Sequence, residues 1–155
     1  MPDATLPTAF VALEHSSLAV WLRSSLAYPV LETVHIIGLA SLFGSLLIVE
    51  LCLLRVIRGV EVIGLAHRIL PWSVLGFLLA AGSGLSMFFA RAGELISNPV
   101  FFTKMLLVMA AGCNAAWLHT RGPLDASSGL TRFQAGLSLL IWLAVIACGR
   151  WIAYV

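Results

Sequence analysis

Residues 30–54, VLETVHIIGLASLFGSLLIVELCLL, decide the fold class of this chain. The stretch carries no charged side chain between Glu32 and Glu50. About 20 mostly apolar helical residues cross the ~30 Å hydrocarbon core of a bilayer. Because backbone groups in lipid must pair within their own segment, such a run has to be a helix. The stretch therefore predicts a membrane-spanning helix.

Three further apolar runs follow, at residues 69–90, 99–120 and 133–155. Segments rich in Gly, Pro, Asn and Ser separate them, and these residues favour turns. Short connections make consecutive helices antiparallel neighbours. We therefore expect an all-α polytopic membrane protein, a four-helix up-down transmembrane bundle that forms one domain over residues 1–155.

The composition supports a lipid environment and excludes several protein classes. Of the 155 residues, 61% are hydrophobic and only 10% are charged. An ordinary soluble domain is about 45–50% apolar and about 25% charged. A soluble enzyme, a disordered tail and a nucleic-acid binder are thus disfavoured, and a net charge of +2 is too small to indicate a polyanionic partner. The lipid bilayer is the partner that the composition predicts.

Residues 6–27 precede the first span and predict an amphipathic helix that lies in the membrane interface. Four of their side chains fall on one helical stripe at spacings of three and four: Val11, His15, Leu18 and Leu22. Trp21 would anchor the helix at the interface, and Tyr28-Pro29 would end it. A plain apolar N-terminal extension is the alternative.

The distribution of basic residues predicts the orientation. We call the end of the bundle that holds both termini side A, and the opposite end side B. Side B carries Arg55, Arg58, Arg68, Arg121 and Arg132, and side A carries Arg23, Arg91, Lys104 and Arg150. Basic loops face the cytoplasm. We therefore expect a multi-pass protein of the bacterial inner membrane with both termini in the periplasm.

Four ionisable residues at similar side A depths are the main functional candidates: Glu32, His35, Lys104 and Arg150. Ionisable groups inside a membrane are costly and usually functional. Each would offset the desolvation of the others by pairing, so we expect one buried polar cluster. The cluster is either a static ion-pair network that sets helix register or a ligand-binding or redox site.

Soft ligands lie at the same depth. Met87, Met105 and Cys148 could join His35 in a Cu(I) site, because sulfur ligands suit copper. The same side chains could equally be ordinary core packing.

Two more histidines lie toward side B. His67 opens the second span and His119 closes the third, so antiparallel packing brings them to one membrane face. They could ligate a haem iron from both sides, or they are interfacial residues that bind headgroups and water.

Three motifs resemble those of HemJ-type protoporphyrinogen oxidases, small four-helix bacterial membrane proteins that bind haem b: Val34-His35-Ile36-Ile37-Gly38, Ala66-His67-Arg68-Ile69-Leu70 and Thr103-Lys104-Met105-Leu106-Leu107-Val108. The copper-resistance D membrane domain is similar in its first and third helices. The segment Gly149-Arg150-Trp151-Ile152-Ala153-Tyr154 resembles the end of an uncharacterised bacterial family of four-helix membrane proteins, and this likeness covers nearly the whole chain.

The HemJ-type resemblance implies that His35 is the haem-associated histidine and Lys104 the buried lysine of the third helix. Phe102 stands where that family carries a second histidine, so its bis-histidine geometry is not expected here. A changed haem site would pair His35 with Met87, Met105 or another histidine.

The favoured function is haem-b binding with a redox or electron-transfer role and a membrane or periplasmic redox partner. His35 would be an axial ligand, Lys104 and Arg150 would offset the propionates, and Glu32 would orient its neighbours. A copper-handling membrane protein and a non-catalytic membrane subunit that docks a partner are the alternatives. Enzymatic activity and assembly into a homo-oligomer stay undecided.

Overall fold

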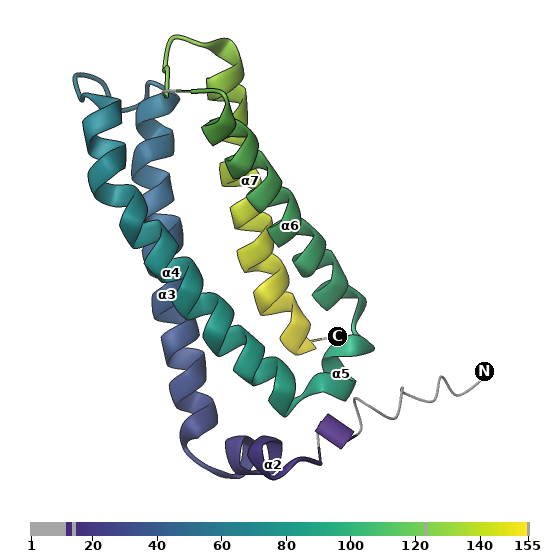
Figure 1. Ribbon diagram of the computed structural model, residues 1–155. Helices are drawn as coiled ribbons and strands as arrows, with labels where there is room; N and C mark the ends of the chain where they lie inside the picture. Colours follow the sequence, from purple (N-terminus) through teal and green to yellow (C-terminus); the bar gives the residue numbers. More distant parts are fainter. Residues whose placement is uncertain (1–11, 14, 123, 155) are drawn as a thin grey trace.

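The computed structural model describes residues 12, 13, 15–122 and 124–154. Every regular element in these ranges is helical (Figure 1). Four of the helices are long and apolar enough to span a membrane: α3 (Ala27–Leu53), α4 (Val62–Ala90), α6 (Pro99–Thr120) and α7 (Gly129–Trp151). The predicted all-α, four-helix transmembrane architecture is confirmed.

Capping residues set where the spanning helices begin. The Glu61 carboxylate accepts from the backbone N–H of Gly64 at 2.8 Å, so α4 starts at Val62 and not at the expected residue 69. Ser128 caps α7 in the same way, so this helix starts at Gly129 and not at residue 133. Asn98 caps α6 directly before Pro99, which is the predicted start.

A short helix, α2 (Ser17–Ser24), crosses the side A end beneath α3 and α4 (Figure 1). It buries Ala19 and Leu22, and Arg23 donates to the carbonyl of Ala90 at 2.8 Å. The expected helix over residues 6–27 is shorter in the described part of the chain, and residues 6–11 and 14 lie outside it. The expected break at Tyr28-Pro29 is wrong, because Pro29 is tolerated in the first turn of α3.

Helices α3 and α4 form the tightest pair in the bundle. A Cβ atom on Gly38 would lie 2.6 Å from the backbone nitrogen of Ala80, and one on Gly76 would lie 2.5 Å from that of Leu42. These glycines let the two backbones meet directly, which is how helices commonly associate in membranes.

The α3–α4 hairpin joins the α6–α7 hairpin chiefly through α3 and α7. Leu42 of α3 packs with Ala111, Trp142 and Val145 in one cluster, and closer to side B a second cluster unites Val49, Leu53, Ala66 and Ala135. The short helix α5 (Ala92–Ile96) links α4 to α6, and α7 continues into a 3₁₀ turn, η1 (Ile152–Tyr154). The end of α7 therefore lies at side A, as does α2 (Figure 1).

Candidate functional site

The His35 ring packs from α3 onto α4 and is half-buried. Its Nδ1 lies 2.8 Å from the carbonyl oxygen of Ala80 and 3.2 Å from Oγ of Ser83. A carbonyl can only accept, so Nδ1–H is the donor and Nε2 of the neutral ring keeps its lone pair. This is the arrangement in which a histidine is oriented for ligation through Nε2.

Gly84 provides the space for this ring. A Cβ atom on Gly84 would lie 3.1 Å from Cε1 and 3.4 Å from Nδ1 of His35. A larger residue here would push the imidazole away from its partners on α4. The orientation of His35 therefore depends on a backbone carbonyl and on a glycine of the same neighbouring helix.

Lys104 approaches the same region from α6. It is half-buried, and its Nζ lies 3.4 Å from the position that a Cβ atom on Gly149 of α7 would take. Its ammonium group is close enough for its charge to act on His35, and the Cys148 thiol interacts with it from α7. His35 and Lys104 therefore lie in the same half of the bundle, His35 against Gly84 of α4 and Lys104 against Gly149 of α7.

Glu32 and Arg150 do not complete a buried cluster, so the expected four-residue arrangement is wrong. Glu32 is exposed on α3. Arg150 is also exposed; it donates to the hydroxyl of Tyr154, and its guanidinium carbon lies 4.7 Å from the centre of that ring. A long side chain near a helix end reaches out toward the interface, which explains why Arg150 leaves the interior.

The sulfur side chains lie on three different helices, α4, α6 and α7. Met87 and Cys148 are half-buried, whereas Met105 is exposed on α6. Cys148 lines a cavity of about 300 Å³ with Val100, Thr103, Ala147 and Trp151. Within the described ranges, no group of three or more His, Cys, Asp or Glu residues could hold a metal ion.

The two side B histidines are exposed. Nδ1 of His119 lies 2.8 Å from the carbonyl oxygen of Ala115 on its own helix. His67 lies on α4 five residues after its start. This is the geometry expected of interfacial histidines.

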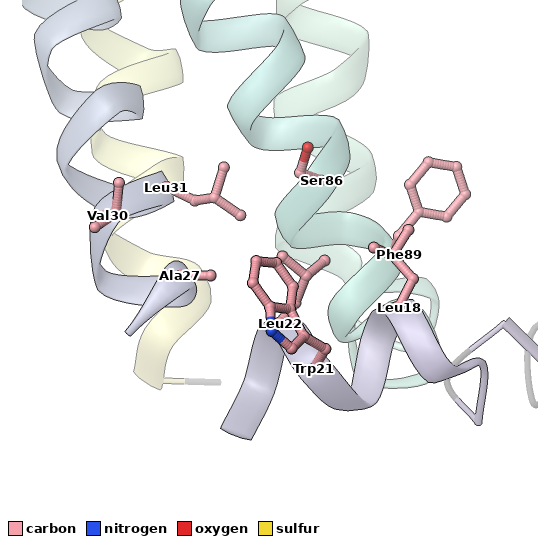
Figure 2. Close-up of a pocket in the computed structure, with 8 residues that line it drawn as sticks. All are labelled: Leu18, Trp21, Leu22, Ala27, Val30, Leu31, Ser86 and Phe89. Carbon is pink, nitrogen blue, oxygen red and sulfur yellow. The ribbon is translucent and has the colours of Figure 1, made fainter. Parts of the chain in front are cut away.

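A second cavity, of about 260 Å³, lies between α2 and the side A ends of α3 and α4 (Figure 2). Figure 2 shows Trp21 and Leu22 below Ser86 and facing Leu31. The remaining lining is apolar: Leu18, Ala27, Val30 and Phe89. It is smaller than the roughly 300–1,000 Å³ of typical ligand pockets, and its lining contains no ionisable side chain.

A family model matches residues 26–155, which include all four spanning helices and each candidate residue described above. The chain belongs to the family of unknown function DUF6644. No curated protein and no solved structure matches it. The comparisons lend no support to a resemblance to HemJ-type oxidases or to the copper-resistance D domain.

This DUF6644 chain also holds buried polar residues that sequence reasoning missed. Glu50 is 6% exposed, Asn114 is 7% exposed and Gln134 is fully buried. All three lie in the side B half of the bundle, on α3, α6 and α7. Glu50 lies at the end of an uncharged run, so the sequence alone indicates a residue at the membrane boundary. Asn114 and Gln134 interrupt apolar runs, and such polar residues within a span could have been recognised from the sequence.

Proposed function

We propose that this protein is an inner-membrane haem-b-binding protein with a redox or electron-transfer role, and that His35 would hold the haem iron through Nε2. The hydrogen bond from Nδ1–H to the Ala80 carbonyl carries the proposal, because it fixes the tautomer and the direction of the ring. A neutral imidazole is the common ligand of haem b.

Two features of the chain support a haem with one histidine ligand. Lys104 supplies a cation beside His35 that would pair with a propionate. Gly84 has no side chain, so the surface of α4 next to the His35 ring carries only backbone at this position. The surrounding helices are apolar. Bound haem b would supply a one-electron redox centre. The chain itself would hold the ring of His35, offset one anionic substituent and exclude water.

The location and the partners belong to the same proposal. The excess of arginines on side B supports a cytoplasmic side B, with His35 in the periplasmic half of the membrane. A membrane or periplasmic redox partner would then approach from side A. The proposal does not extend to protoporphyrinogen oxidase activity, because Phe102 stands where the HemJ-type motif carries a second histidine.

The absorption spectrum of the detergent-solubilised protein, purified with haem supplied, tests the proposal. We expect a Soret band at stoichiometric intensity that is lost in His35→Ala and kept in His67→Ala, an exposed histidine. Ser83→Ala should keep the band, because the Ala80 carbonyl still orients the ring.

A colourless protein, or a Soret band that survives His35→Ala, would overturn the assignment. Colourless protein that retains copper after dialysis would favour the copper-handling alternative. Colourless, metal-free protein that co-purifies with a stoichiometric partner would favour the non-catalytic subunit.

A further inference from the structure

Glu50 is an acidic side chain enclosed by protein within a spanning helix. It is 6% exposed, and its Oε2 has no hydrogen-bond partner in the described structure. It precedes the last residue of α3 by three positions, so it lies roughly 4.5 Å along the axis from the side B end of that helix. A buried carboxylate without full pairing is costly, and it becomes neutral by binding a proton or a cation.

Polar side chains of α6 and α7 surround it. The Ser138 hydroxyl on α7 interacts with the Glu50 carboxyl group. Gln134, one turn earlier on α7, accepts at its backbone oxygen from Nδ2 of Asn114 at 3.0 Å. Its side-chain Oε1 accepts from Arg121 at 3.0 Å. Polar contacts therefore run from the exposed Arg121 inward to Gln134, which lies one helical turn from Ser138 on α7.

The unpaired atoms of this group suit both protonation states of a carboxyl group. Nε2 of Gln134 is a buried donor without a partner in the described structure, and Oδ1 of Asn114 is an equally unpaired acceptor. The ionised carboxyl needs a donor, and the protonated carboxyl needs an acceptor. Gln134 lies one helical turn from Ser138, which interacts with Glu50, and Asn114 bonds to Gln134, so a complementary group for each state belongs to this polar group.

The charged and titratable groups at this end do not neutralise Glu50. Apart from the Cys52 thiol, which is buried on the same helix, they lie on the surface and are exposed: Arg55 and Arg58 after α3, Glu61, His67 and Arg68 at the start of α4, His119 and Arg121 at the end of α6, Asp125 in the following loop and Arg132 on α7. Arg55 donates to the carbonyl of Ala126, and Arg121 reaches only the amide of Gln134.

We propose that Glu50 is a proton-binding site that exchanges protons with water at side B. On binding, an O–H bond of a hydronium ion breaks, an O–H bond forms on Oε2, and the carboxyl charge changes from −1 to zero. On release, the proton returns to water, so no further reactant is needed. This site is separate from His35 and does not depend on haem.

Infrared difference spectroscopy on the haem-free protein in liposomes of neutral lipid tests the proposal. A pH titration should produce the C=O stretching band of a protonated carboxyl group while a carboxylate band decreases. Glu50→Gln should remove this pair of bands, and Glu32→Gln, which changes an exposed carboxylate on the same helix, should keep it.

Two variants test the surrounding groups and cover the case in which Glu50→Gln does not fold. Gln134→Leu removes the donor for the ionised state, so proton affinity should rise about tenfold, a shift of roughly one pH unit in the midpoint. Asn114→Leu removes the acceptor for the protonated state and should lower proton affinity by a similar factor. Shifts of the same sign in both variants would overturn the proposal.

Other outcomes also contradict it. Bands that do not titrate, or that persist in Glu50→Gln, would show that Glu50 does not exchange a proton. If sodium chloride at fixed pH removes the protonated band and choline chloride does not, the site binds a metal cation in competition with the proton and the assignment as a dedicated proton site fails.

Discussion

The two halves of the bundle place polar groups in the interior by different means. In the side A half, His35 bonds to a backbone carbonyl of α4 and keeps one ring nitrogen available. In the side B half, the side chain of Gln134 binds Arg121 and its backbone binds Asn114. Glu50 is buried in the same half and interacts with Ser138. A ring nitrogen that a backbone contact holds in one direction suits the binding of a cofactor. A network of polar side chains suits the binding of a small exchangeable ion such as a proton. Three substitutions, two of them with a control on the same helix, test this difference. They are ordered by decreasing expected effect on stability.

Gly38→Ala should have the largest effect, because it separates the helix pair on which the His35 site rests. The added Cβ would lie 2.6 Å from a backbone nitrogen and 2.8 Å from a backbone oxygen of α4. Relieving this overlap requires the two helix backbones to move apart. We expect a loss of about 1–3 kcal/mol in the free energy of unfolding. Thermal or denaturant unfolding in detergent measures it.

Gly44→Ala is the matched control on the same helix, since a Cβ atom there meets nothing within 4 Å. Its stability should equal or slightly exceed that of the wild type, because Ala favours helix by up to about 1 kcal/mol. Equal destabilisation by both substitutions would contradict the close packing of α3 on α4.

Gln134→Ala should disturb the side B half alone. It leaves a cavity and removes the partner of Arg121, which should cost about 2 kcal/mol. Leu140→Ala, at an exposed position of the same helix, should cost less. The Soret band should not change in either variant, and its loss in Gln134→Ala would show that the two halves are coupled.

Asp125→Asn should have the smallest effect on stability, because its contacts are confined to the loop between α6 and α7. The Ser127 hydroxyl and backbone N–H, both 2.7 Å from its carboxylate, lower the pKa of Asp125. The folded state therefore favours the ionised form, and the stabilisation is present above the ordinary pKa of about 3.9. It is lost as the pH falls through the lowered value.

Unfolding temperatures of the wild type and Asp125→Asn, compared from neutral to acidic pH, check this expectation. The wild type should be slightly more stable near neutrality, and the difference should disappear in acid. A difference that grows as the pH falls would contradict the sign.

Hydropathy alone predicts the spanning helices because the bilayer imposes both their length and their apolar character. The start of α6 also follows from sequence, since Asn98-Pro99 is a local capping signal. The start of α4 does not follow from the sequence. The polar pair His67-Arg68 suggests the end of the apolar run but lies inside the helix, and the capping residue Glu61 lies before that run. The break before α3 was misplaced for a related reason, as Pro29 is compatible with a first turn.

For the candidate site, position along the helix predicts depth but not direction around the axis. Depth places both His35 and Lys104 in the side A half of the bundle, where the Lys104 charge acts on His35. It failed for Arg150, because the buried face of α7 is set by Gln134, Trp142 and Val145, and Arg150 lies on another face. Position along the helix also does not predict that the Glu50 side chain points into the bundle. A residue near the end of a span can face either lipid headgroups or protein.

The ligand state of the iron in haem-reconstituted protein tests the central claim most directly. Electron paramagnetic resonance of the ferric protein should show a high-spin signal from haem with one histidine ligand, and His35→Ala should abolish it. A low-spin signal of two histidine ligands, or no haem retained by the wild-type protein, would contradict the account.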